Sequence, residues 1–430
     1  MEGSNSKLNL KKILIQILNP VITGTVRFTI FFPILLLLYP IKRDNSLWAI
    51  MGMNVEKFRD NTKYLFLYTQ NNEIKDLKFI YITSNKMVYQ SLKRKGYSVV
   101  YLYSIRGIWT LIRAGGVIVD NLDWSLKHFG IIYALTSGAR KVQLWHGIPI
   151  KKIELDNKKD RLIQLFKEKN PSIKTKLLRL IYYPRYVRYD TVLSPSQSYK
   201  KIFASAFGVP AKNILVANYP RNEFLLNSET FGGWDIGIDN ETLKILKQRK
   251  KEGYKIVLYL PTFRDTNRPA ISKKELLHLS SKLHSQGIIL AIKPHPWDRS
   301  LRELLSKFDC KNIVVIRAEE DPYPYLHLAN ALITDVSSIQ FDYLLLNRPI
   351  VYFMHDYSQY KKRDREVYVD LNEIVNIEPC EDITCVIKEV IENINKMSPK
   401  MIKRQLKLKR TIFGTSIMTG CKEIVKHLTG

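Results

Sequence analysis

The chain has 430 residues, a formal net charge of +28 and a hydrophobic content of 45%. This length exceeds one ordinary hydrophobic core and fits two α/β domains of about 150–200 residues each. The apolar content excludes intrinsic disorder, and the positive charge predicts an anionic partner: a membrane surface, a nucleic acid or a polyanionic substrate.

The first element is an apolar run over 28–41 that two prolines interrupt. A membrane-spanning helix needs about 20 apolar residues, and Arg27 stops this run from extending toward the N-terminus. No small-residue cleavage site follows, which argues against a signal peptide. We predict that 1–45 is a membrane-associating segment that lies on or dips into one leaflet, with Lys42 and Arg43 at the headgroups. A short true span is the alternative.

Short apolar runs recur along the rest of the chain, with helical patterns between them. Most are continuous rather than alternating, which is typical of strands buried on both faces of a parallel sheet. The repeated strand–helix order therefore predicts two doubly wound α/β domains. Strands are expected at 77–83, 97–103, 115–120, 141–147 and 191–196 in the first half, and at 214–220, 255–263, 287–295, 312–317, 330–335 and 348–353 in the second.

The domain break is predicted near 205–215, where the sequence FGVPAKN places Gly and Pro between a helical and a strand pattern. This divides the chain into an N-terminal domain over 46–210 and a C-terminal domain over 211–396. The helical stretch that follows, 397–430, is expected to pack back across the junction.

A basic segment lies at 151–190, with twelve Lys or Arg against five Asp or Glu and with aromatic residues and leucines interleaved. A charged face exposed to water is the alternative, and it would be favoured if the charges were balanced in sign. The positive excess, with apolar residues at helical spacing, favours a surface that lies on anionic lipid. Nucleic acid is the competing anion, but the chain has no zinc-finger spacing and no RNA-binding motif, so we expect no nucleic-acid partner.

The cysteines do not have the spacing of a metal site. Two of them are separated by four residues, and no CxxC occurs. Reduced thiols in a cytosolic setting are therefore expected. The four residues are Cys310, Cys380, Cys385 and Cys421.

The segment 333–343, ITDVSSIQFDY, predicts the end of a buried strand followed by the first turns of a helix. Ser337 and Ser338 then lie where backbone N–H groups are left unpaired and the helix dipole is positive. Such a helix start is a binding site for an anion, usually a phosphate.

Two histidines also follow predicted strands, His146 in WHG and His295 in KPHP. The carboxyl ends of parallel strands share one edge, so the histidines and the serine pair can converge there. A neutral imidazole at His146, on a turn forced by Gly147 and Pro149, can take a proton from an incoming hydroxyl. Lys293 and an imidazolium at His295 suit the charge of a phosphoryl group in transfer. For each histidine alone, a structural role at a strand end is the alternative.

Further basic residues follow two other strands. Thr262 and Arg264 lie at the mouth of the strand in LYLPTFRD, and arginine can bind phosphate oxygens through two parallel hydrogen bonds. A surface ion pair of Arg264 with the next residue is the alternative. The segment 356–370 supplies Arg363 and Arg365, which either close over an anionic ligand or remain solvated.

Several motifs are absent from the sequence. It contains no P-loop, no GxGxxG after a strand, no HExxH and no DxD pair that would hold a metal on a nucleotide diphosphate. A mechanism without metal or cofactor is therefore predicted. In it a helix N-terminus, Arg, Lys and His neutralise the diphosphate.

Taken together, these motifs resemble the CDP-glycerol glycerophosphotransferase family, whose members prime and polymerise wall teichoic acids. At this length the chain is similar to the shorter, primase-type members. Ile148 replaces the family's Thr, and 361–366 replaces its usual Arg-Gly pair. The matching segments are WHGIPIKK, YPRNEFL, YLPTFRD, KPHP and DVSSIQFDYLLLNRPIVYF, in family order from about 141 to 370.

The resemblance implies a GT-B fold, in which two Rossmann-like domains face a cleft and the C-terminal one holds most of the nucleotide. It implies catalytic roles for His146 and His295. Donor binding is assigned to Thr262, Arg264, Lys293, Ser337, Ser338, Asp342, Arg363 and Arg365, and an acceptor-side or structural turn to Trp145, Gly147 and Pro149.

The predicted activity is transfer of a polyol phosphate from CDP-glycerol or CDP-ribitol to a hydroxyl of an undecaprenyl-diphosphate-linked saccharide or polymer, with release of CMP. Glycerol phosphate is preferred. The resemblance also implies a monotopic protein on the cytoplasmic side of the cell membrane, held there by 28–43 and 151–190. Two alternatives remain open: a GT-B glycosyltransferase that uses a nucleotide sugar, and a non-enzymatic membrane- or polyanion-binding protein. The second explains the charge but not the ordered motifs.

Overall fold

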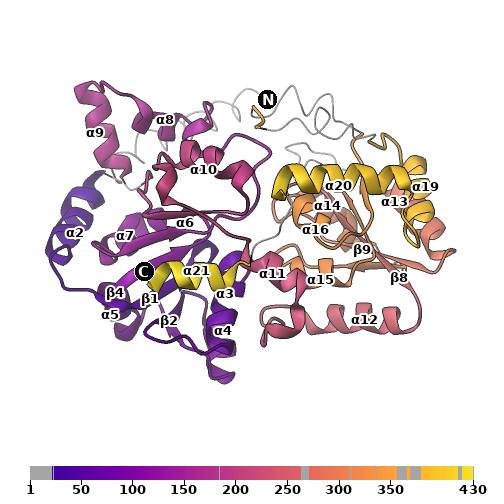
Figure 1. The fold of residues 1–430 in the computed structure, drawn as a ribbon, viewed down its shortest axis with the longest axis horizontal. Helices are drawn as coiled ribbons and strands as arrows, with labels where there is room; N and C mark the ends of the chain where they lie inside the picture. The colour runs from indigo at the N-terminus through magenta and orange to yellow at the C-terminus, as the bar shows by residue number, and fades with distance from the viewer. Residues whose placement is uncertain are drawn as a thin grey trace, which may run out of the picture.

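Two parallel sheets build two lobes that lie side by side in the computed structural model (Figure 1). We call them the first lobe, built on a seven-stranded sheet, and the second lobe, built on a five-stranded sheet. The structure describes residues 22, 24–183, 185–262, 271–308, 310, 312–335, 337–355, 366–368, 379–414 and 419–429.

The first sheet has the order β3-β2-β1-β4-β5-β6-β7, with parallel neighbours throughout. The direction of winding reverses between β1 and β4, which is where such sheets bind ligands. Close packing there requires a glycine, because a Cβ on Gly116 would lie 2.2 Å from the Trp48 ring. The strands are β1 (Asp44–Met51), β2 (Lys78–Thr83), β3 (Val99–Tyr101), β4 (Ala114–Val119), β5 (Arg140–Gln143), β6 (Thr191–Ser194) and β7 (Ile214–Val216).

The second sheet has the order β10-β9-β8-β11-β12 and is also parallel. Its winding reverses between β8 and β11. The two doubly wound domains predicted from the sequence are therefore confirmed. The strands are β8 (Lys255–Leu260), β9 (Ile288–Ile292), β10 (Ile313–Val315), β11 (Ala331–Thr334) and β12 (Ile350–Tyr352).

Two details of the predicted strand set are wrong. The central strand β1 was not predicted, because its apolar part, 47–51, is short and closely follows the longer apolar run over 28–41. The strand at 214–220 was placed in the second half, but β7 pairs with β6 through Val192 and Ile214. The predicted break at 205–215 thus falls one strand too early.

Helices cover both faces of each sheet, and several begin at side-chain caps that satisfy the first N–H groups. Helix α13 begins at a capping box in which Ser272 and Glu275 exchange hydrogen bonds. The first-lobe helices are α2 (Phe32–Leu38), α3 (Asp60–Asn71), α4 (Lys86–Arg94), α5 (Ile105–Arg113), α6 (Asp123–Leu126), α7 (Ile131–Leu135), α8 (Arg161–Lys167), α9 (Ile173–Tyr182), α10 (Lys200–Phe207) and α11 (Pro220–Leu226). The later helices are α12 (Asn240–Lys251), α13 (Lys273–His284), α14 (Arg299–Ser306), α15 (Tyr323–Leu328), α16 (Ile339–Leu344), α19 (Ile383–Asn393), α20 (Pro399–Phe413) and α21 (Cys421–Thr429).

The last two helices connect the lobes (Figure 1). Helix α20 contacts α16 in the second lobe and the short helix η5 (Gln197–Tyr199) in the first. Helix α21 lies against the first lobe, where His427 hydrogen-bonds to Thr191 at 2.9 Å. The start of α21 is held by Glu223, whose carboxylate accepts the N–H of Cys421 at 2.8 Å.

The apolar run near the N-terminus forms a short π-helix, η1 (Arg27–Phe31), and then α2. Within the described residues, no helix has both the length and the apolarity needed to cross a membrane. Arg27 is buried and donates to the carbonyls of Ile181 and Phe129. Arg43 was expected at lipid headgroups, but it donates to backbone carbonyls instead, including Leu135 at 3.1 Å, because these carbonyls lie at helix ends.

The basic segment over 151–190 contributes α8 and α9, which pack on each other. Its first residues pair with the second lobe, where Lys151 bridges to Val367 and the N–H of Lys152 bonds to the Glu366 carbonyl at 2.7 Å. Residues 366–368 are therefore held against the first lobe.

Two of the cysteines form a disulfide, Cys380–Cys385, with their Cα atoms 5.3 Å apart. The expectation of reduced thiols is wrong for this pair. A tight turn brings them together, because Asp382 caps α19 by accepting the N–H of Cys385 at 2.9 Å. Cys310 and Cys421 are free thiols.

Candidate functional site

A cavity of about 620 Å³ lies between the two lobes, at the carboxyl ends of β1, β4, β5 and β9. We call it the junction cavity. It brings together six of the residues predicted from the sequence, from both lobes. These are Trp145, His146, Lys293, His295, Ser337 and Ser338.

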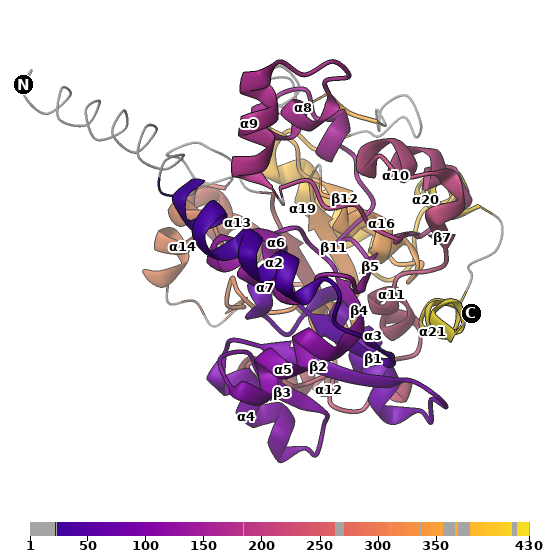
Figure 2. The same cartoon turned by 90° about the vertical axis from the view of Figure 1, so that its left-hand side faces the viewer.

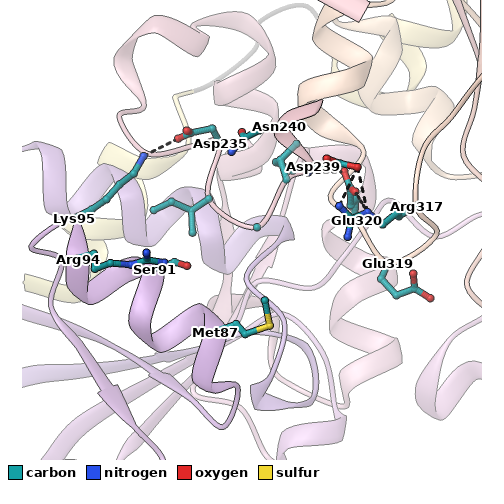
Figure 3. A pocket seen from close by; sticks show the side chains of 13 residues that line it. Met87, Ser91, Arg94, Lys95, Asp235, Asp239, Asn240, Arg317, Glu319 and Glu320 are labelled. Carbon is teal, nitrogen blue, oxygen red and sulfur yellow. Dashed lines mark hydrogen bonds and ion pairs between the residues drawn. The ribbon is translucent and has the colours of Figure 1, made fainter. Parts of the chain in front are cut away.

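A second cavity of about 700 Å³ opens beside it, between α4 and two second-lobe segments, 235–240 and 317–320 (Figure 3). Its charges neutralise one another, since Lys95 pairs with Asp235 at 3.0 Å and Arg317 pairs with Asp239 at 2.9 Å. None of the predicted site residues lines it. The junction cavity is therefore the candidate active site.

His146 follows β5 on a turn that we call the WHG turn, Trp145 to Gly147. Its Nδ1 lies 2.9 Å from the carbonyl oxygen of Asp120. A carbonyl only accepts, so Nδ1 carries the proton and the neutral ring presents Nε2 as an acceptor. Burial lowers the pKa of His146, and Asp60 opposes this shift. The ring is therefore neutral at physiological pH. Its side chain is accessible through the cavity, so it is suited to accept a proton.

The WHG turn is tightly constrained. Trp145 has φ of 57° and Gly147 has φ of 153°, so the backbone at position 147 favours glycine. A Cβ on Gly147 would lie 2.9 Å from Ser338 Oγ, which places the turn directly against the serine pair of the second lobe. Pro149 and Ile148 are buried behind the turn, so a hydroxyl at position 148 would face the core and not the cavity.

His295 follows β9 in the second lobe and differs from His146 in its hydrogen bonding. Its Nδ1 accepts the N–H of Trp297 at 3.2 Å, so a neutral ring carries its proton on Nε2. Burial, with Lys293 and Arg59 nearby, lowers the pKa of His295 to about 4. The imidazolium expected at this position is therefore wrong, and the ring is a neutral hydrogen-bond donor.

Among the described residues, four cations line the junction cavity: Lys57, Arg59, Lys293 and Arg221, the last of which is paired with two carboxylates. Lys293 Nζ donates to the Ala318 carbonyl at 2.7 Å, and burial lowers the pKa of this lysine to about 8. Arg59 donates to the Glu319 carbonyl at 3.3 Å. These cations suit a diphosphate. The same lining carries five carboxylates, of which Asp60 is paired with Arg221 and Asp321 with Lys63.

The helix that follows the serine pair is shorter than the sequence predicted. Helix α16 covers six residues, and Ser338 precedes it without capping it through its side chain. Ser337 Oγ accepts the N–H of Ile339 at 3.4 Å. The hydroxyls of both serines reach the cavity, while the dipole of so short a helix adds less than we expected.

Two residues assigned to donor binding have other roles. Asp342 is fully buried, and its Oδ2 accepts from Arg221 at 2.7 Å and from the Tyr323 hydroxyl at 2.6 Å. The N–H and hydroxyl of Thr262 both donate to Asp335, which ties the ends of β8 and β11 together. Neither residue lines the junction cavity. The assigned Arg264, Arg363 and Arg365 lie outside the described residues.

Sequence reasoning missed one wall of the cavity, formed by Lys57, Arg59, Asp60 and Asn121. The first three follow β1, and a polar, basic stretch after an apolar strand was the signal that could have found them. Arg221 also lines the cavity. It stands in the YPRN motif but was given no role.

The chain matches the family described as CDP-Glycerol:Poly(glycerophosphate) glycerophosphotransferase over residues 31–414. It belongs to that family. The resemblance drawn from five ordered motifs is therefore confirmed.

Related proteins include teichoic acid enzymes of two genera. The chain is 24% identical over 373 residues to the teichoic acid poly(glycerol phosphate) polymerase of Bacillus subtilis, an alignment that covers 84% of this chain and 44% of that protein. It is 25% identical over 360 residues to the teichoic acid glycerol-phosphate transferase of Staphylococcus aureus, with 79% and 83% covered. The chain thus spans less than half of the first relative and most of the second.

Among solved structures, the wall teichoic acid polymerase TagF superposes with a TM-score of 0.67 at 19% identity, over 100% of this chain and 98% of that one. At this identity the likeness shows the fold. The predicted GT-B fold is confirmed.

Proposed function

We propose that this protein transfers a polyol phosphate, preferably glycerol phosphate, from a CDP-activated donor to an acceptor hydroxyl and releases CMP. One observation carries the proposal. The junction cavity presents an imidazole acceptor from the first lobe and an imidazole donor from the second, beside the cations Lys57, Arg59 and Lys293. Family membership supports the donor class.

In the proposed reaction, Nε2 of His146 takes the proton of the acceptor hydroxyl as its oxygen attacks the β-phosphorus. The new oxygen–phosphorus bond forms while the bond from that phosphorus to the bridging oxygen breaks. The bridging oxygen leaves on CMP with its electron pair. The Nε2–H of His295 donates to the phosphate oxygens, and the Ser337 and Ser338 hydroxyls supply further donors.

The cations perform the charge neutralisation that a metal ion provides in other transferases. Lys57, Arg59 and Lys293 line one cavity that a diphosphate would share with them. We therefore propose that the reaction needs neither metal nor cofactor, and that the CDP-polyol is its substrate.

The proposed site of action is the cytoplasmic face of the cell membrane, where a lipid-linked saccharide or polymer supplies the hydroxyl. The C-terminal end of α9 lies close to α2 (Figure 2), and the rings of Phe32 on α2 and of Tyr183, which follows α9, are 6.4 Å apart. The two helices expose large apolar side chains, with Leu37 73% and Ile173 87% exposed. Lysines flank these side chains on α9. This combination is typical of a surface that lies on anionic lipid.

The test measures CMP release from CDP-glycerol and CDP-ribitol, and nucleoside diphosphate release from a nucleotide sugar, with purified protein and a lipid-linked acceptor. His146→Ala should lower the rate by about 10²–10⁴-fold, the usual contribution of a general base. His278→Ala is the matched control, because His278 is exposed on α13. Full activity in His146→Ala would remove the proposed base, and turnover of the nucleotide sugar alone would favour a glycosyltransferase.

A further inference from the structure

Arg221 is the centre of a buried ionic cluster that joins the two lobes. Its side chain is 3% exposed. Nη1 donates to Asp60 Oδ1 at 2.7 Å and to the His146 carbonyl at 2.9 Å, while Nη2 donates to Asp342 Oδ2 at 2.7 Å. Asp60 begins α3 in the first lobe and Asp342 lies on α16 in the second. One guanidinium thus bonds to the catalytic turn and to both lobes.

The cluster fixes the guanidinium in one position. The rings of Tyr219 and Tyr323 each have their centroids 5.0 Å from its central carbon, and Tyr323 also donates to Asp342. Burial opposes the charge on Arg221, but the carboxylates of Asp342 and Asp60 outweigh burial and raise its pKa. A charge buried this deeply is tolerated only with its partners in place, so the geometry is strongly specified.

The WHG turn depends on donors from outside itself. Its three carbonyls, in order, accept from Asn61 Nδ2 at 2.7 Å, from Arg221 Nη1 at 2.9 Å and from the Tyr219 hydroxyl at 3.2 Å. In the described part of the chain, Arg221 is the one of these three donors whose side chain also bonds to the second lobe. The carbonyl that Arg221 binds and the imidazole ring belong to the same residue, His146, so a shift of this carbonyl also shifts the ring.

We propose that Arg221 is a positioning residue that sets His146 in register with the donor site of the second lobe. Asp342 lies on the helix that begins directly after Ser338. A movement of α16 relative to the first lobe therefore moves Asp342, Arg221 and the His146 backbone together. This inference rests on the proposed function, since it assigns Arg221 to the reaction in which His146 is the base.

The proposal has an electrostatic consequence that a purely structural role lacks. His146 is faced by Asp60 and Asp123 from the first lobe, by the Asp120 carbonyl and by Arg221. Across the cavity stand Arg59, Lys293 and His295. Burial is the main cause that lowers the pKa of His146, and Arg221 adds to it while Asp60 opposes it. Removal of Arg221 leaves Asp60 unpaired beside the ring, so the pKa of His146 rises and the acid limb of kcat moves to higher pH.

A matched control exists in the same molecule. Lys63 and Asp321 form an ion pair of 3.1 Å with both side chains fully buried, and it also links α3 to the second lobe. Lys63 makes no contact with the WHG turn among the described hydrogen bonds. Lys63→Gln therefore removes a buried ion pair between the lobes without changing a contact of the WHG turn.

The experiment measures kcat, KM and the pH profile of CMP release in Arg221→Gln, Asp342→Asn and Lys63→Gln, with folding checked by circular dichroism. Arg221→Gln should lower kcat about 100-fold, the effect of a misplacement of about 1 Å, and shift the acid limb to higher pH. Asp342→Asn should lower kcat about tenfold, although Asp342 does not line the cavity. Lys63→Gln should lower stability and keep the wild-type acid limb, and because its partner Asp321 lines the junction cavity, it should lower kcat by less than Arg221→Gln does.

The inference is overturned if folded Arg221→Gln keeps the wild-type kcat and acid limb, or if Lys63→Gln reproduces both changes. If Arg221→Gln does not fold, the near-isosteric Asp342→Asn decides: a wild-type kcat there overturns the inference. A wild type that releases no CMP from any CDP-polyol contradicts the proposed function instead.

Discussion

The two walls of the junction cavity carry the same side chain in opposite hydrogen-bonding states. On the first-lobe wall, Nδ1 of His146 faces a carbonyl, which leaves Nε2 as an acceptor. On the second-lobe wall, Nδ1 of His295 faces a backbone N–H, which leaves the proton on Nε2. The backbone partner of Nδ1 therefore makes Nε2 of His146 an acceptor and Nε2 of His295 a donor.

The charges around the two rings support the same distinction between an acceptor and a donor. Carboxylates, Asp60 and Asp123, lie near His146, where they favour the protonated ring that the proposed reaction would form. Burial lowers the pKa of His295 most, and the nearby cations Lys293 and Arg59 lower it further, so this ring is neutral. This difference suits the first-lobe wall to accept a proton and the second-lobe wall to bind an anion.

The largest expected effect on kcat comes from replacing each of the two histidines by glutamine in a separate variant. A glutamine amide nitrogen is a donor, so His295→Gln keeps the donor and should lower kcat about tenfold. His146→Gln replaces the basic nitrogen by an amide oxygen, which accepts a hydrogen bond but is too weak a base to take a proton. It should therefore lower kcat by about 10³-fold, within the range of a lost general base. CMP release at pH 7.5 gives both numbers. Equal losses in the two variants would break the comparison.

How far sequence could predict these walls depends on the kind of signal. The WHG, KPHP and DVSS motifs stand at strand ends, and because parallel strands share an edge they were correctly expected to converge. The protonation state of His295 was not predictable, since it depends on burial and on Arg59, which is remote in sequence. The wall after β1 was missed because the strand itself was missed.

Asp342 shows a second limit of prediction from the sequence. A motif reports that a residue type recurs beside a site, but not whether its side chain faces the ligand or the core. Asp342 lies on the buried face of α16, where Arg221 reaches it from more than 100 positions away along the chain. Such a partner follows from the docking of the two lobes, which no local pattern encodes.

The next effect concerns the apolar face of the first lobe. Leu37→Glu and Ile173→Glu should each weaken binding to vesicles that contain phosphatidylglycerol by about tenfold or more, because each removes an apolar side chain worth about 1.5–3 kcal/mol when buried. Co-sedimentation measures the bound fraction. Ile245→Glu, at a side chain 48% exposed on α12 of the second lobe, is the control and should bind as wild type does. Equal weakening in the control would contradict a membrane face on α2 and α9.

A smaller effect is expected on stability. The folded-state pKa of His295 is about 4, below the ordinary value of about 6.5, so the unfolded chain binds more protons between these pH values. The free energy of unfolding should therefore fall as pH drops from 6.5 to 4, by about 1–2 kcal/mol after discounting for solvent screening. Urea unfolding at pH 7 and pH 5 tests this, and His295→Gln should reduce the difference. An unchanged pH dependence in that variant would show that the ring titrates normally.

The smallest expected effect is that of a chelator. Lys57, Arg59 and Lys293 supply positive charge to the junction cavity, so CMP release should be unchanged after dialysis against EDTA. Loss of activity that Mg²⁺ or Mn²⁺ restores would contradict the metal-free proposal. It would also mean that the cationic wall does not neutralise the donor alone.

The most direct test of the central proposal compares CMP released with polyol phosphate gained by the acceptor, using CDP-glycerol and the wild-type protein. We expect equal amounts of the two products, and loss of both in His146→Gln. Release of CMP without extension of the acceptor, or the same yields in His146→Gln, would contradict transfer by a base on the WHG turn.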